Sequence, residues 1–82
     1  MFKAKVIVRL KKEVSDPQGK AVGEALRSLR YEGVGEVRVG KYFDVTLDEA
    51  DRAKAEEKLS RMCHELLSNP VIEDYSFELD EG

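Results

Sequence analysis

Strict alternation of apolar and polar side chains at the start of the chain constrains the fold more than any other feature of this sequence. Over Phe2–Leu10, every even-numbered residue is apolar, and the intervening positions carry Lys3, Lys5, Ile7 and Arg9. A period of two is typical of a strand with one buried face and one face in water. We therefore expect a half-buried strand over this segment.

A first helix is predicted after a short loop. Asp16 can cap its N-terminus and Pro17 suits the first helical position, while Glu32-Gly33 marks its end. Apolar residues follow at helical spacing, and they are Val22, Ala25, Leu26 and Leu29. Gly19 and Gly23 each cost about 1 kcal/mol of helix stability relative to alanine. We expect another backbone to approach the helix closely at these glycines.

A second helix is predicted between Asp48 and Ser68. The acidic residues at its start suit the positive end of the helix dipole, and Asn69-Pro70 stops it. Its apolar positions predict a buried stripe, made of Ala55, Leu59, Met62, Cys63, Leu66 and Leu67.

Three further strands are predicted from the remaining segments. Val34–Leu47 predicts two strands joined at Gly40-Lys41, and Val71–Leu79 predicts the last one. A two-residue loop would leave Val39 and Phe43 on opposite faces, so we expect a three-residue loop or a bulge.

The order strand–helix–strand–strand–helix–strand predicts an α+β fold of the ferredoxin-like βαββαβ type. Right-handed crossovers would give a four-stranded antiparallel sheet with both helices on one face. A length of 82 residues predicts a single domain, residues 1–82. A core this small favours self-association.

The charge is unevenly distributed along the chain. Residues 1–41 hold ten Lys/Arg and five Asp/Glu, and residues 42–82 hold four and twelve, which gives +5 and −8 and the net charge of −3. In the predicted sheet the cationic first strand lies beside the last strand, with Asp74, Glu78 and Asp80. This internal pairing argues against nucleic acid as a partner. The open sheet face also offers Tyr42 as its single aromatic on the third strand, which is a poor platform for stacking bases.

No catalytic, cofactor or metal site is expected in the chain alone. Cys63 is the single cysteine, which excludes an internal disulfide, and His64 is the single histidine. Neighbouring helical residues point about 100° apart, so Cys63 and His64 cannot act as nucleophile and base. The glycine-containing turns lack the spacing of a phosphate-binding loop.

Protein–protein contact is the function that these features favour. Ile7, Tyr42 and Ile72 are apolar residues on the open sheet face, where water is expected, and the sheet has two open edges. The chain shows no signal-peptide pattern and no apolar run of about 20 residues. We therefore expect a cytoplasmic protein with no membrane partner.

Three stretches together resemble the PurS family, the small subunit of phosphoribosylformylglycinamidine synthase. They are Asp16–Val22, Val37–Phe43 and Met62–Tyr75, and the resemblance extends from about Lys3 to Leu79. One departure is Arg30, where the family often has glycine. Gly33 is then expected to supply the left-handed residue at the end of the first helix.

The resemblance implies a role in purine synthesis. The family's complex uses ATP, Mg²⁺ and glutamine to convert formylglycinamide ribonucleotide to its amidine. A glutaminase subunit releases ammonia and a large synthetase subunit consumes it. The small subunit would bridge them and assist ammonia transfer, with no cofactor and no catalysis of its own. It would also form a homodimer or homotetramer.

Candidate partner-contact residues are chosen from the same stretches. They are Asp16, Pro17, Gln18 and Gly19 at the helix entry, Arg38, Gly40, Lys41 and Tyr42 at the hairpin, and Asn69, Pro70, Val71, Ile72, Glu73, Asp74 and Tyr75 after the second helix. Each group also has a purely structural interpretation, as a cap, a turn and a helix stop. The alternative function is a stand-alone regulatory module that binds an amino acid at a dimer interface.

Overall fold

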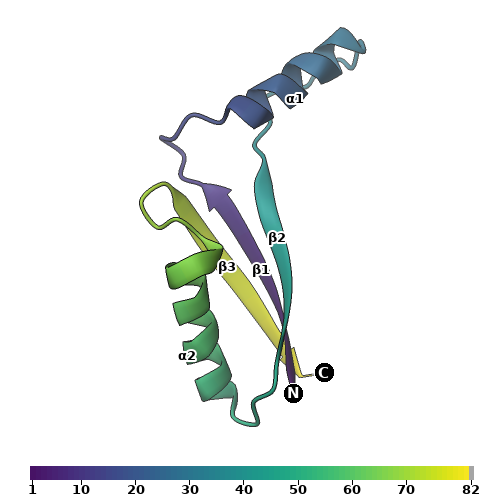
Figure 1. The fold of residues 1–82 in the computed structure, drawn as a ribbon. Helices are drawn as coiled ribbons and strands as arrows, with labels where there is room; N and C mark the ends of the chain where they lie inside the picture. The colour runs from purple at the N-terminus through teal and green to yellow at the C-terminus, as the bar shows by residue number, and fades with distance from the viewer. Residues whose placement is uncertain (82) are drawn as a thin grey trace.

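The computed structural model describes residues 1–81, which form one antiparallel sheet and two helical segments (Figure 1). The sheet has three strands in the order β2-β1-β3, and they span Phe2–Leu10 (β1), Gly40–Leu47 (β2) and Glu73–Glu81 (β3). The predicted first strand is confirmed by the alternating burial of β1. Its register also places Lys3, Lys5 and Arg9 opposite Asp80, Glu78 and Asp74, as the charge pattern predicts.

The first helix begins where the sequence predicts, whereas the second begins at Arg52, four residues after the predicted start at Asp48. α1 spans Pro17–Ser28 and is capped by Asp16, whose carboxylate accepts from Gly19 N at 2.9 Å. α2 spans Arg52–Met62 and is capped by Asp51, whose carboxylate accepts from Ala53 N at 3.0 Å. Both are short polar side chains that replace a missing backbone acceptor at a helix start.

A π-helical turn, η1 (Cys63–Leu67), continues α2 to its end. Its wide turn brings Ser68 N to within 2.9 Å of the Cys63 carbonyl. The extra residue in this turn shifts the phase of the helix. Cys63 remains buried, whereas Leu66, which the sequence places in the buried stripe, is 83% exposed.

The core lies between one face of the sheet and α2 (Figure 1). Its buried side chains come from β1, α2, η1 and β3, and they are Phe2, Ala4, Val6, Val8, Ala55, Leu59, Cys63 and Leu79. Each large one stabilises the fold by about 1.5–3 kcal/mol relative to exposure. This half of the molecule completes its own core.

The prediction of four strands with both helices on one face is wrong. Val34–Val39 forms no strand, and α1 lies beyond the end of the sheet instead of over it (Figure 1). The chain continues through Gly40 without a hairpin, so neither a three-residue loop nor a bulge forms there. The reason is that the apolar residues of this segment stay an even number of positions apart on both sides of Gly40. Val37, Val39, Phe43, Val45 and Leu47 are all odd, and uninterrupted extended chain places alternate residues on one face.

We call residues 17–39, which comprise α1, the turn after it and the return segment Val34–Val39, the arm. The arm makes the molecule elongated, with extents of 50 × 27 × 15 Å. Gly35 and Val37 in the return segment contact Arg27 and Gly23 of α1, so the two parts of the arm run side by side.

The turn at the far end of α1 differs from the expectation. Arg30 itself adopts the left-handed conformation with φ 69°, and Gly33 has φ 78°. Tyr31 N donates to Leu26 O at 3.3 Å and Arg30 N to Arg27 O at 2.9 Å, which closes the last helical carbonyls in a Schellman arrangement. Arginine therefore occupies a position that favours glycine.

No helix within residues 1–81 has the length and apolar character needed to cross a membrane.

Candidate protein-contact surfaces

The segments that the sequence singles out for partner contact meet at one end of the sheet (Figure 1). Lys11, which follows β1, links two of them. Its amide donates to Ile72 O at 2.9 Å, and its carbonyl accepts from Arg38 Nη2 at 3.0 Å. Gly40 lies beside them, opposite Arg9. The structure thus brings the helix entry, the start of β2 and the segment before β3 to the same end.

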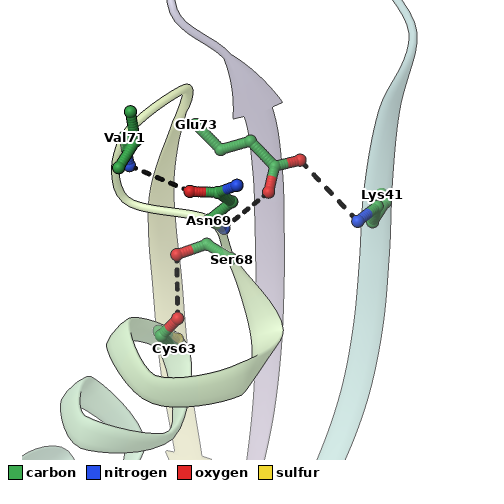
Figure 2. Close-up of polar contacts among 6 residues, drawn as sticks. All are labelled: Lys41, Cys63, Ser68, Asn69, Val71 and Glu73. Carbon is green, nitrogen blue, oxygen red and sulfur yellow. Dashed lines mark hydrogen bonds and ion pairs between the residues drawn. The ribbon is translucent and has the colours of Figure 1, made fainter.

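The five residues between η1 and β3, Ser68–Ile72, form a loop that we call the contact loop (Figure 2). Ser68 Oγ donates to Cys63 O at 2.8 Å. Asn69 Oδ1 accepts from Val71 N at 3.1 Å, and Asn69 O accepts from Ile72 N at 3.1 Å. Asn69 thus stops the helix by closing this turn with its side chain, and it does not adopt the left-handed conformation. These bonds hold the loop in one shape.

Glu73 explains why a charged residue interrupts an apolar pattern. Its Oε1 accepts from Asn69 N at 2.7 Å, and its Oε2 lies 3.7 Å from Lys41 Nζ on β2 (Figure 2). The Glu73 side chain is only 11% exposed, and its carboxylate satisfies a backbone donor that would otherwise lack a partner. Two of the predicted groups, those of Lys41 and Glu73, are therefore in direct contact.

Apolar side chains are exposed on and beside this rigid loop. Val71 is 79% exposed, Ile72 39% and Tyr75 36%, and Pro70 is also exposed. Leu66 is a further exposed apolar residue, and its predicted place in the buried stripe is wrong, because a constant helical period cannot reveal a π-turn. Since a rigid loop loses little conformational entropy on binding, exposed apolar groups on it suit protein contact.

A second set of contacts forms the joint between the arm and the sheet. Asp16 Oδ2 accepts from Val39 N at 2.7 Å, in addition to the bond from Gly19 N. Arg38 Nη2 donates to Lys11 O and to Val14 O, both at 3.0 Å. The bonds from Gly19 and then Val39 hold the pKa of the Asp16 carboxyl below its ordinary value. Pro17 and Gln18 are exposed in the first turn of α1.

Gly19 confirms the expected close backbone approach. A Cβ at this position would collide with the Val37 carbonyl oxygen and lie 2.7 Å from Asp16 Oδ2. Gly23 is less constrained, because a Cβ there would lie 3.5 Å from Val37 Cγ2. The joint therefore depends on glycine at position 19.

The open face of the sheet carries Tyr42 and Asp74. Tyr42 is 54% exposed beside Ile7, which is 37% exposed. The Tyr42 hydroxyl donates to Asp44 Oδ1 at 2.9 Å, and this bond raises the pKa of Tyr42. Asp74 lies opposite Arg9 on the same face.

Outside these contact surfaces lie a buried thiol and a cleft beside α1. Cys63 is fully buried, and burial raises the pKa of its thiol. Within residues 1–81, no group of three or more His, Cys, Asp or Glu side chains is placed to hold a metal ion. A cleft of about 570 Å³ lies between the loop before α1, α1 itself and the return segment, and its lining carries charges of both signs that include Lys12, Glu13 and Glu36.

Comparison with known proteins gives a consistent result across the whole chain. Residues 3–81 match the family model described as PurS, phosphoribosylformylglycinamidine (FGAM) synthase. The PurS subunit of Bacillus subtilis is 48% identical over 81 residues, which is 99% of this chain and 95% of that protein.

Solved structures agree. A structure of B. subtilis PurS superposes with a TM-score of 0.90 at 48% identity, covering 99% of this chain and 100% of that one. A chain in the structure of PurLQS from Thermotoga maritima superposes with a TM-score of 0.86 at 30% identity, covering 98% and 99%.

Proposed function

This chain belongs to the PurS family, and on that premise we propose how it serves phosphoribosylformylglycinamidine synthase. It is a subunit of that ligase complex, which acts in purine biosynthesis and uses ATP. Its contribution is to bind the glutaminase and the large synthetase subunit, hold them together and assist ammonia transfer. Mg²⁺ and ATP would be bound by the other subunits, and the complex would work in the cytoplasm.

The observation that supports this role is the contact loop. Asn69, Ser68 and Glu73 hold it in a single shape, while Val71 stays 79% exposed. Ammonia must remain neutral to act as a nucleophile, so its route between subunits must exclude bulk water and stray protons. A rigid surface with exposed apolar side chains can close such a junction and requires no nucleophile of its own.

A homodimer, or a homotetramer built from it, is part of the proposal. The apolar stripe of α1 includes Val22, 43% exposed, and Leu29, 70% exposed. Within its own chain α1 does not cover the sheet (Figure 1). An amphipathic helix of this kind is stable in water once its apolar face is buried, and a small core alone gives little stability.

Reconstitution tests the proposed function. The glutaminase and synthetase are mixed with glutamine, ATP and Mg²⁺, and amidine formation is measured with and without this chain. Glutamine-dependent activity should require the chain, and Val71→Asp should reduce it at limiting subunit concentration. Lys54→Asp, at an exposed position of α2, is the matched control. Equal activity with and without the chain would refute the proposal.

The same experiment distinguishes the alternative function. Reaction driven by added ammonium salt should depend on the chain less than the glutamine-driven reaction, because free ammonia bypasses the transfer step. Saturable binding of a free amino acid to the isolated chain, measured by calorimetry, together with no effect on amidine formation, would favour the regulatory module.

A further inference from the structure

A hollow on the open face of the sheet lies where β2 begins, at the end next to the arm (Figure 1). Its volume is about 310 Å³, and its walls include Ile7 and Arg9 of β1, Arg38 of the return segment and Tyr42 of β2. Pockets that hold small molecules start at about this size. None of the residues that line the hollow belongs to the contact loop, which carries the proposed role.

A missing side chain creates the hollow. Gly40 lies opposite Arg9 in the pairing of the two strands. Residues two apart in extended chain share a face, so Arg38 and Tyr42 flank Gly40 on the open side. A Cβ at Gly40 would lie 3.5 Å from Arg9 Cγ and 2.7 Å from the Val8 carbonyl oxygen. The close carbonyl explains why glycine occupies this position, and the space beside Arg9 is left without a side chain.

The charge of the hollow has one sign. Among residues 1–81, those that line it include the cations Arg9, Arg38 and Lys41 and no aspartate or glutamate. The Lys41 ammonium lies 3.7 Å from Glu73, which offsets its charge. The guanidinium groups of Arg9 and Arg38 therefore determine the local charge, and they favour an anion.

Both arginines can serve a ligand. Arg9 is exposed opposite Asp74 of β3, but the ion pairs within residues 1–81 involve other cations, namely Lys41, Arg52, Lys58 and Arg61. Arg38 is held in place by the carbonyls of Lys11 and Val14, each 3.0 Å from its Nη2. These two bonds use a single nitrogen, so the charge and the other N–H groups of Arg38 remain.

An aromatic ring forms another wall of the hollow. Tyr42 is 54% exposed, and Ile7, its neighbour across the strands, is 37% exposed. The Tyr42 hydroxyl donates to Asp44 Oδ1 at 2.9 Å, which restrains the ring. A single aromatic side chain is a poor platform for a run of bases, but it can stack on one base.

We propose that this hollow binds a nucleoside monophosphate. The phosphate lies between the guanidinium groups of Arg9 and Arg38, and the base stacks on the ring of Tyr42. Arginine suits a phosphate because its planar fork donates two parallel hydrogen bonds. Glycine at position 40 lets the ligand approach the sheet backbone closely. The small size of the hollow favours one phosphate and one base over a larger ligand.

Titration calorimetry of the wild-type chain in phosphate-free buffer tests the site. AMP is the probe, ribose 5-phosphate presents the phosphate without a base, and adenosine presents the base without a phosphate. AMP should bind saturably and about tenfold more tightly than either fragment, because it makes both contacts. No saturable binding of AMP, or equal affinity for AMP and ribose 5-phosphate, would overturn the proposal.

Variants of exposed residues provide the second readout. Arg9→Gln should weaken AMP binding about tenfold, because it removes a charge-assisted hydrogen bond. Lys3→Gln is the matched control, since it removes the same charge from the same face of β1 outside the hollow, and it should bind AMP like the wild type. Equal losses in these two variants would mean that only the overall charge attracts AMP, and would contradict the site.

The ring of Tyr42 is tested in the same way. Tyr42→Ala should lower the affinity for AMP to that for ribose 5-phosphate and leave the affinity for ribose 5-phosphate unchanged. Tyr42→Phe keeps the ring and should bind AMP like the wild type. Undiminished AMP binding by Tyr42→Ala would exclude stacking on this side chain.

Nucleotide binding goes beyond the proposed function, and the two are tested separately. AMP binding is measured on this chain alone, whereas the proposed function is measured as amidine formation by the reconstituted complex. If AMP does not bind but Arg9→Gln removes the stimulation of amidine formation, the arginines hold a carboxylate of a partner subunit, and the nucleotide site is refuted. AMP binding by a chain that gives no stimulation would refute the proposed role and leave the site in place.

Discussion

Both helices of this chain carry an apolar stripe, but only α2 buries its stripe against the sheet of the same chain. α2 packs against β1 and completes a core in which Leu59 and Cys63 are fully buried, whereas α1 leaves Leu29 70% exposed. Arg52 at the start of α2 donates to Leu79 O at 3.0 Å and lies 5.7 Å from the ring of Phe2, which fastens that helix to the sheet. α1 is fastened only at the joint. An apolar stripe therefore indicates that a helix packs against another apolar surface. The path of the chain determines which surface that is.

The largest expected effect distinguishes the two halves. Leu59→Ala should lower the free energy of unfolding by about 3 kcal/mol, because it leaves a cavity in a fully packed site. Leu29→Ala should change the unfolding of the monomer by less than about 0.5 kcal/mol, because the side chain is mostly exposed there. Urea denaturation of both variants at low protein concentration checks the contrast, and equal losses would contradict it.

The joint gives the next largest effect. Gly19→Ala should destabilise the arm by about 2 kcal/mol, since a Cβ there collides with the Val37 carbonyl. Hydrogen exchange should then accelerate in α1 and stay unchanged in β1. Gly23→Ala is the matched control, and it should slow exchange in α1 slightly because alanine favours a helix. Equal behaviour of the two variants would mean that the close approach is not important.

Acidification should loosen the arm before the core. The pKa of Asp16 is held below its ordinary value of 3.8 by the bonds from Gly19 N and Val39 N. A carboxyl with a lowered folded pKa stabilises fully above its unfolded value, and this stabilisation is lost as the pH falls through the folded pKa. Protection of α1 amides should therefore decline below about pH 4. Asp16→Asn should show weaker protection with no such decline, and an unaltered pH profile in this variant would exclude Asp16 as the cause.

The smallest expected effect is a gain in stability. Arg30→Gly should stabilise the end of α1 by about 0.5–1 kcal/mol, because Arg30 holds φ 69° and glycine reaches that conformation without steric cost. Slower exchange at the amides of Arg27 to Tyr31 would show it. Leu29→Gly, just before the left-handed residue, should destabilise instead. A loss of protection in Arg30→Gly would mean that the arginine side chain makes a more important contact.

Much of the fold follows from local sequence patterns. The alternation of Phe2–Leu10 and the cap at Asp16 predict elements that the structure contains, and the second helix is predicted too, although it starts four residues after Asp48. What local patterns do not fix is whether the chain turns back at Gly40. Both a hairpin and a straight passage suit a Gly-Lys dipeptide, and the odd numbering of Val37 through Leu47 is the one signal that favours the straight passage.

The candidate site is also only partly predictable, because local patterns identify its residues but do not predict the turns that bring them together. Asn69 and Glu73 belong to the segment that carries the family resemblance, but their mutual hydrogen bond depends on a turn that residue spacing alone does not predict. The helical spacing wrongly predicts that Leu66 is buried, since the π-turn that exposes it breaks the helical period. Contact by the chosen residues with partner subunits stays a prediction.

One measurement tests most directly whether the arm is completed by a second copy while the α2 half completes itself. Sedimentation equilibrium of the wild-type chain at micromolar concentration gives its mass in solution. The account predicts twice the mass of the chain or an even multiple of it, with no monomer detectable. A stable monomer whose α1 amides are nonetheless protected from hydrogen exchange would contradict it.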